Sequence, residues 1–77
     1  MASWKDIASE VCLARGVTRK EVFSPMRHPH IARARWEIMS RIRNETKLSY
    51  RQIGSYMGRN HFSVLYGVRR WEEIRGE

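Results

Sequence analysis

Hydrophobic residues recur every three or four positions along most of the chain, which is the spacing of one buried helix face. The first such stretch predicts a helix that begins at Ser3 and ends at Gly16, and Asp6 follows Ser3 at the spacing of a capping box. A short second helix should begin at Thr18, because Glu21 follows it at the same spacing. The expected buried stripe of the first helix consists of Trp4, Ile7, Ala8, Val11, Cys12 and either Ala14 or Arg15.

The middle of the chain combines a loop with a longer helix. Residues 24–30 contain both prolines of the chain and show no hydrophobic period, so they predict a loop. Trp36 lies off the stripe of the helix that follows, and both packing and contact with a partner remain open for its ring. The expected buried stripe of that helix consists of Ile31, Arg35, Ile38, Met39 and Ile42.

The segment 48–71 predicts two short helices joined by a tight turn. Ser49 and Gln52 have capping-box spacing, Gly58 is suited to end the first helix, and Asn60 is suited to cap the second. The apolar faces of the two helices are expected at Ile53, Tyr56 and Met57 and at Val64, Leu65, Val68 and Trp71. This pattern is typical of a helix-turn-helix, whose second helix presents its first residues to base edges in a major groove.

Positive charge is concentrated in the middle of the chain. The protein carries a formal net charge of +7, with 15 Lys and Arg against 8 Asp and Glu. Between residues 27 and 70, ten basic residues stand against two acidic ones, a local charge of +8, and nine of the ten are arginines. The planar guanidinium group suits phosphate and guanine. This distribution indicates a polyanionic partner, and a generic solvated surface is the alternative.

Length and cysteine content limit the class of protein. The 77 residues fit one domain with one small core, assigned to residues 1–77 with a recognition unit at 48–74. Cys12 is the only cysteine, so an internal disulfide is impossible and a reducing cytoplasm is expected. No apolar run approaches the roughly twenty residues of a membrane span, and no signal peptide opens the chain. We therefore expect a cytoplasmic, nucleoid-associated protein without a membrane partner.

The run IGSYMGRNHFSVLYGVRR resembles one family closely. The C-terminal duplex-binding domain of the bacterial replication initiator DnaA has the motif IGxxFGGRDHTTVLHAxRK. The resemblance implies an all-α domain of about five helices with a helix-turn-helix, of the Trp-repressor-like type. The departures are a missing second glycine before Arg59, Phe62 in place of the first threonine of the motif and Tyr66 in place of its histidine. Just before the run, Arg51 stands where the family has proline. The direct matches are Ile53, Gly54, Gly58, Arg59, His61, Val64, Leu65 and Arg69, and the near matches are Asn60, Ser63 and Arg70.

The resemblance also implies which residues contact DNA. Asn60 stands where the motif has Asp, and its amide can pair with adenine N6 and N7, with a pure capping role as the alternative. An exposed Phe62 would touch a thymine methyl group. Base contacts are expected from Asn60, His61, Phe62 and Ser63. For Tyr66, packing at the rim of the core is an equal alternative to a phosphate contact. Contacts with the DNA backbone or a minor groove are expected from Arg27, His28, His30, Arg33, Arg35, Lys47, Ser49, Tyr50, Arg51, Arg59, Tyr66, Arg69 and Arg70.

Catalytic and metal-binding patterns are missing from the sequence. It contains no phosphate-binding glycine loop, no nucleophile beside a base and no zinc-ligand spacing, so we expect no enzyme, no cofactor and no metal. The expected function is sequence-specific binding of double-stranded DNA, similar to DnaA-box recognition, in replication initiation or its control. The alternatives are a transcriptional regulator of mobile-element type, bacterial or phage, and a protein-interaction module with a basic face. Other replication or regulatory proteins are further candidate partners, and the oligomeric state stays open.

Overall fold

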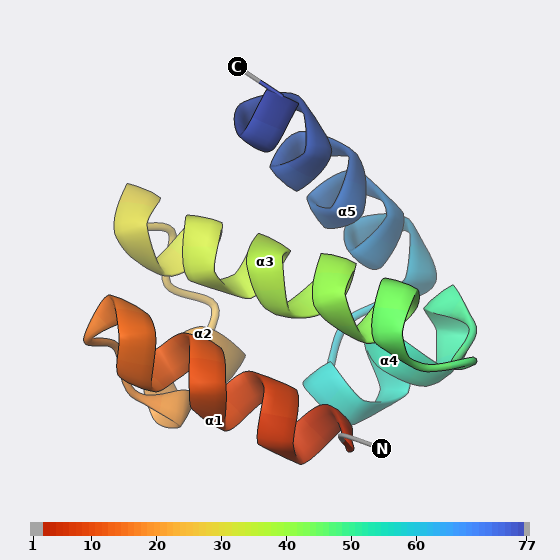
Figure 1. Ribbon diagram of the computed structural model, residues 1–77, viewed down its shortest axis with the longest axis horizontal. Coiled ribbons are helices and arrows are strands. Elements are labelled where there is room, and N and C mark those ends of the chain that lie inside the picture. The colour runs from red at the N-terminus through yellow and green to blue at the C-terminus, as the bar shows by residue number, and fades with distance from the viewer. Residues whose placement is uncertain (1–2, 77) are drawn as a thin grey trace.

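The computed structural model describes residues 3–76, and this part of the chain forms five α-helices and no strand. The central element is α3, which packs against each of the other four helices and in Figure 1 runs between α1 and α5. The all-α prediction is confirmed. The five helices are α1 (Trp4–Arg15), α2 (Arg19–Phe23), α3 (Pro29–Glu45), α4 (Tyr50–Met57) and α5 (His61–Gly76).

Local capping contacts determine where three of these helices begin. The pairs Ser3–Asp6, Thr18–Glu21 and Ser49–Gln52 all form the predicted capping boxes, in which each side chain accepts the backbone N–H of the other residue. Gly58 ends α4 with a φ of 68°, a left-handed conformation that costs glycine little. The predicted helix starts and the predicted end of α4 are therefore confirmed.

The start of α3 differs from the prediction. The predicted loop at 24–30 extends only to residue 28, and Pro29 and His30 form part of the first turn of α3. A proline suits the first helical position because its missing N–H would have no partner there and its φ is already helical. The connection between α2 and α3 is therefore the short loop 24–28.

All five helices contribute to one hydrophobic cluster, in which α3 supplies the largest share. Burying each of the larger aliphatic side chains contributes about 1.5–3 kcal/mol to folding. The predicted buried stripes of α1 and α3 are confirmed for their aliphatic members. The buried hydrophobic residues are Ile7, Ala8, Val11, Cys12, Val17, Val22, Ile31, Ala34, Ile38, Met39, Ile42, Ile53, Met57, Val64 and Val68.

Some residues predicted for buried faces lie at the surface. Ala14 and Arg15 are both exposed, and the Arg15 guanidinium lies against Glu37 and the Trp71 ring rather than in the core. Tyr56 is 45% exposed, since its ring stacks on the half-buried Trp4 with centroids 5.0 Å apart rather than entering the cluster. The exposure of these three side chains cannot be predicted from the sequence pattern, because it depends on which helices pack together.

The packing of α5 on α3 also departs from the predicted stripe. Leu65 is half-buried, whereas Gly67 is fully enclosed. A Cβ added to Gly67 would lie 2.5 Å from Met39 Sδ and 2.9 Å from Trp36 Cδ1. The glycine therefore leaves room for Trp36 to pack between α3 and α5, and contact of its half-buried ring with a partner stays a prediction.

Candidate nucleic-acid interface

The helix-turn-helix consists of α4, the turn at 58–60 and α5. The Arg59 N–H donates to the Gly54 carbonyl at 2.8 Å, so the turn lies against the middle of α4. A Cβ on Gly54 would lie 2.3 Å from the Arg59 carbonyl oxygen, which only glycine avoids. Because Ile53 and Val64 join the same core cluster, the start of α5 has a fixed position relative to α4.

The first two turns of α5 present an aromatic and polar surface. Phe62 is 68% exposed and Tyr66 is 58% exposed, and both lie on the side of the helix opposite the buried Val64. Ser63 is exposed, and the half-buried His61 ring lies 4.1 Å from the Phe62 ring, centroid to centroid. The structure thus brings the residues predicted for base contact together on one accessible surface.

Asn60 caps α5. Its Oδ1 accepts the backbone N–H of Ser63 at 2.9 Å, which satisfies a donor that the helix leaves free. The carbonyl oxygen has two lone pairs, so a bidentate contact with adenine would use the second while the first caps the helix, and this contact stays a prediction. The cap leaves Nδ2 as the donor available for a base, and its partners are acceptors such as adenine N7, guanine O6 or thymine O4.

A groove between α3 and α5 adjoins this surface. It consists of two neighbouring hollows of 360 and 650 Å³ that share Arg35, Trp36 and Tyr66. The rings of Trp36 and Tyr66 meet edge to face at 6.1 Å, and the Arg70 guanidinium lies 5.5 Å from the Trp36 ring centroid. Among residues 3–76, no acidic residue lines either hollow. The first hollow is also lined by Met39, Arg59, Asn60, Phe62 and Ser63, and the second by Arg27, Pro29, Ala32, Arg33, Arg70 and Ile74.

Arg35 and Arg59 lie deeper than the predicted DNA contacts require. Arg35 is only 6% exposed. Its guanidinium donates to the carbonyls of Val22, Ser24 and Met26 at 2.8, 2.9 and 2.9 Å. Arg59 is half-buried and donates to the same Ser24 carbonyl at 2.5 Å. Nε and Nη2 of Arg35 thus donate inside the fold, which favours a role through the loop, and direct contact of Arg35 with DNA stays a prediction.

Burial also changes the acidity of these two guanidinium groups. It lowers the pKa of Arg35 to about 10, and the positive charge of Arg59 contributes to this shift. Burial lowers the pKa of Arg59 as well. Arg35 nevertheless remains protonated at neutral pH, so two positive charges are held close together by main-chain carbonyls.

The other residues predicted to contact the backbone fall into two groups. All of these side chains are exposed except Tyr50 and Arg70, which are half-buried. The Tyr50 ring lies 4.9 Å from the Arg43 guanidinium, and the Ser49 hydroxyl is occupied by its cap. The group at the start of α4 consists of Lys47, Ser49, Tyr50 and Arg51. The group from loop 24–28, α3 and α5 consists of Arg27, His28, His30, Arg33, Tyr66, Arg69 and Arg70.

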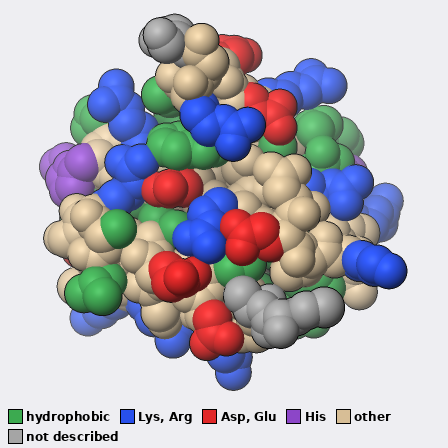
Figure 2. All heavy atoms as spheres, viewed as in Figure 1, with side chains coloured by type: hydrophobic (Ala, Val, Ile, Leu, Met, Phe, Trp, Pro, Cys, Tyr) green, Lys and Arg blue, Asp and Glu red, His purple; other side chains and the backbone are tan. Residues whose placement is uncertain are grey.

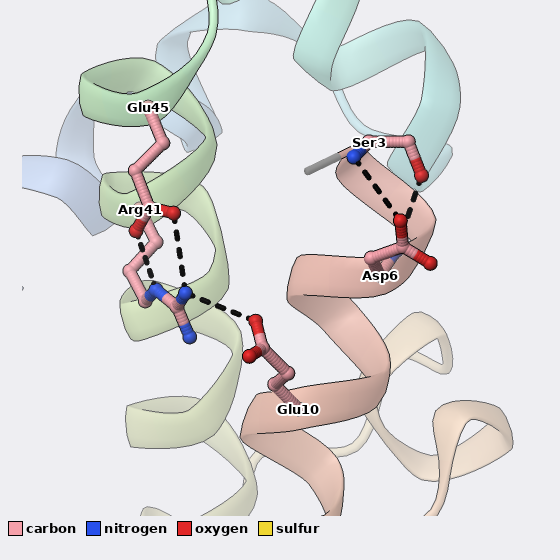
Figure 3. A network of polar contacts seen from close by, with 5 residues as sticks. All are labelled: Ser3, Asp6, Glu10, Arg41 and Glu45. Atoms are coloured by element: carbon pink, nitrogen blue, oxygen red, sulfur yellow. Dashed lines mark hydrogen bonds and ion pairs between the residues drawn. The ribbon is translucent and has the colours of Figure 1, made fainter. Parts of the chain in front are cut away.

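Ion pairs gather on the face formed by α1 and α3. Arg41 contacts Glu10 of α1 at 3.1 Å and Glu45 of α3 at 2.6 Å (Figure 3). Arg15 contacts Glu37 at 2.5 Å. The hydrogen bond from Arg41 lowers the pKa of the Glu45 carboxyl group. Figure 2 shows acidic side chains clustered over α1 and α3, so basic residues on this face are largely neutralised.

Most of the basic residues around the candidate interface lack such partners. Arg70 contacts Glu73 at 2.8 Å. No other ion pair within residues 3–76 involves this surface. The uncompensated charge is therefore carried by exposed residues that include Arg27, Arg33, Lys47, Arg51 and Arg69.

Trp36 and Met39 belong to the groove although the sequence pattern does not place them there. The only available signal was the position of Trp36 off the buried stripe and next to Arg35. Met39 offered no signal, because its helical spacing assigns it to the core, where one side of it also lies.

A tight turn, an accessible start of α5 and uncompensated arginines beside it define a helix-turn-helix DNA-binding domain. The family model of the bacterial dnaA protein helix-turn-helix matches residues 4–70, so the chain belongs to this family of DNA-binding domains. A search of the solved structures found no match. Within residues 3–76, no helix is both long and apolar enough to cross a membrane.

Proposed function

We propose that this protein binds duplex DNA sequence-specifically, with the start of α5 in the major groove, at a site related to the DnaA box. Its role would be in replication initiation or its control. One observation carries the proposal: Asn60 and the exposed face of the first two turns of α5 adjoin a groove whose lining, in the described part of the chain, contains arginines and no acidic residue. A major groove accepts an α-helix, and phosphates on both sides of it supply the matching negative charge.

The proposed contacts with DNA are of two kinds, those with base edges and those with phosphates or a minor groove. Asn60 Nδ2, His61, Phe62 and Ser63 are proposed to meet base edges, because they lie at the accessible start of α5. The exposed basic residues of loop 24–28, α3 and α4 are proposed to hold phosphates or enter an adjacent minor groove, which fixes the protein on the duplex without specifying sequence.

Selection of bound duplexes from a random pool tests this function. A motif related to the DnaA box supports a replication role, and an unrelated motif supports an operator and therefore the role of a transcriptional regulator. Recovery of no motif at all, with binding that does not distinguish one duplex from another, would refute sequence-specific recognition.

Asn60→Asp is expected to change the selected motif at a single base pair by about 1–3 kcal/mol. Asp keeps the acceptor that caps α5, so the helix should remain intact. It replaces the Nδ2 donor by an acceptor, which favours a cytosine amino group over a base acceptor. Parallel selections with both proteins at one salt concentration measure the change, and Ser55→Ala on the exposed side of α4 serves as control. Identical motifs would restrict Asn60 to its capping role.

A further inference from the structure

We infer that Arg35 and Arg59 are positioning residues that hold loop 24–28 in a fixed place beside the start of α5, so that Arg27 reaches DNA in register with the base-contacting residues. This inference rests on the proposed function. It assigns to the buried Arg35 and the half-buried Arg59 a role in recognition that they perform through the loop rather than by touching a base.

The geometry joins three parts of the fold at one atom. The Ser24 carbonyl oxygen accepts from Arg35 Nη2 at 2.9 Å and from Arg59 Nη2 at 2.5 Å. Arg35 comes from the middle of α3, and Arg59 from the turn immediately before α5. The loop is therefore connected directly to the turn that orients the recognition helix. We refer to Arg35, Arg59 and the Ser24 carbonyl as the arginine clamp.

The two ends of loop 24–28 are anchored to the neighbouring helices, but its middle has little support. The Ser24 N–H and hydroxyl donate to the Glu21 carbonyl at 3.2 and 2.6 Å, and the Ala32 N–H donates to the His28 carbonyl at 2.8 Å. Among the described residues, no backbone-to-backbone hydrogen bond outside the helices involves residues 25–27. The Ser24 hydroxyl accepts from the Met26 N–H at 3.2 Å, and Arg35 Nη2 holds the Met26 carbonyl at 2.9 Å. The position of Arg27, the next residue, therefore depends on the clamp.

The three carbonyl bonds of Arg35 require arginine, whereas Arg59 donates to the Ser24 carbonyl, and its buried Nε has no hydrogen-bond partner among the described residues. A guanidinium group has donors in a rigid planar fork and can bond several separate carbonyls, whereas an ammonium group is a compact charge on a flexible stem. Within residues 3–76 neither Arg35 nor Arg59 forms an ion pair with a carboxylate. Burying uncompensated charge is costly, and an apolar side chain would fill the space at lower cost. The fold therefore uses the hydrogen-bond donors of these side chains and not their charge.

The clamp is relevant to DNA binding because residues proposed to contact DNA lie beside it. Arg27 lies in the loop and lines the second hollow, while Asn60 and Ser63 line the first. Arg35 lines both hollows and Arg59 lines the first, so the clamp adjoins both sets of residues. A loop that is free to move would have to be ordered at the moment of binding, which weakens the contribution of its side chains.

A double-mutant cycle on the duplex recovered by selection tests the inference. Arg27→Ala is expected to weaken binding roughly ten-fold in the otherwise unchanged protein, as loss of a charged hydrogen bond does. In an Arg59→Lys background, which keeps the charge but not the fork, the same change should weaken binding less than about two-fold, since the loop is already displaced. The matched control is Arg33→Ala, an exposed arginine of α3 outside the loop, whose cost should be equal in both backgrounds.

Thermal melting of each variant confirms folding before binding is measured, and Arg35→Lys repeats the cycle if Arg59→Lys does not fold. Coupling of Arg27 but not of Arg33 to the clamp supports the inference. Equal costs of Arg27→Ala in both backgrounds, or no cost in either, would overturn it while leaving the proposed function intact. Absence of sequence-specific binding by the unchanged protein would instead refute the proposed function.

Discussion

Replacing Val68 by Asp is expected to unfold the domain at 25 °C. Val68 is 5% exposed and belongs to the core cluster that joins α5 to α3. An ionised carboxylate at this position would lose its hydration without gaining a partner, so we expect a loss of about 4–5 kcal/mol. Domains have roughly 0.05–0.15 kcal/mol of stability per residue, which leaves a chain of 77 residues little in reserve. Circular dichroism and thermal melting measure the effect.

Leu13→Asp is the matched control for this substitution. Leu13 lies on α1 and is 86% exposed, so the same kind of change introduces a charge without burying it. We expect this variant to keep its helical signal and melt within a few degrees of the unchanged protein. Equal melting temperatures of the Val68 and Leu13 variants would show that the buried face of α5 is assigned incorrectly.

Gly54→Ala is expected to destabilise the domain by about 1–3 kcal/mol and to weaken DNA binding in addition. The new Cβ would lie 2.3 Å from the Arg59 carbonyl oxygen, a backbone atom that cannot move without shifting the turn. The turn carries Arg59 and Asn60, so its displacement changes both the clamp and the cap of α5. Urea denaturation and a binding titration measure the two effects.

Whether Gly54→Ala lowers or raises the free energy of unfolding distinguishes a steric contact from an effect of helix propensity. Helix propensity alone would make alanine more stabilising than glycine inside α4, by roughly 0.5–1 kcal/mol. Ser55→Ala, at the exposed neighbouring position, should show the effect of helix propensity alone, without a steric contact. A Gly54 variant that is as stable as the Ser55 variant would contradict the close approach of the turn to α4.

Helix ends were well predicted from the sequence because the contacts that define them are local. A capping box such as Ser49–Gln52 involves residues three positions apart, and Gly58 needs only its own backbone conformation. Pro29 was the exception, since a proline that ends one element can equally begin the next. The buried stripes were predicted where aliphatic residues repeat and failed where packing depends on a neighbouring helix, as at Tyr56.

The parts of the interface that the sequence left open depend on contacts between distant residues. Arg35 was placed both on the buried stripe and among the DNA contacts, and only the fold shows that carbonyls 9 to 13 residues away accept its donors. Likewise, the pairing of Arg41 with Glu10, 31 residues apart, removes one arginine from the free charge, whereas Arg33 stays unpaired within the described residues. Residue type identified the candidate DNA contacts. Contacts between distant residues in the fold then separated arginines that pair within the protein from arginines that do not.

The affinity ratio between a selected duplex and its scrambled version, measured at one salt concentration, tests the central claim most directly. For the unchanged protein we expect a ratio of roughly 10³ or more. Simultaneous replacement of His61, Phe62 and Ser63 by Ala, all in the first turn of α5, should reduce this ratio toward one while salt-dependent binding to any duplex persists. A ratio near one for the unchanged protein, or a ratio that survives the triple replacement, would contradict recognition by the start of α5.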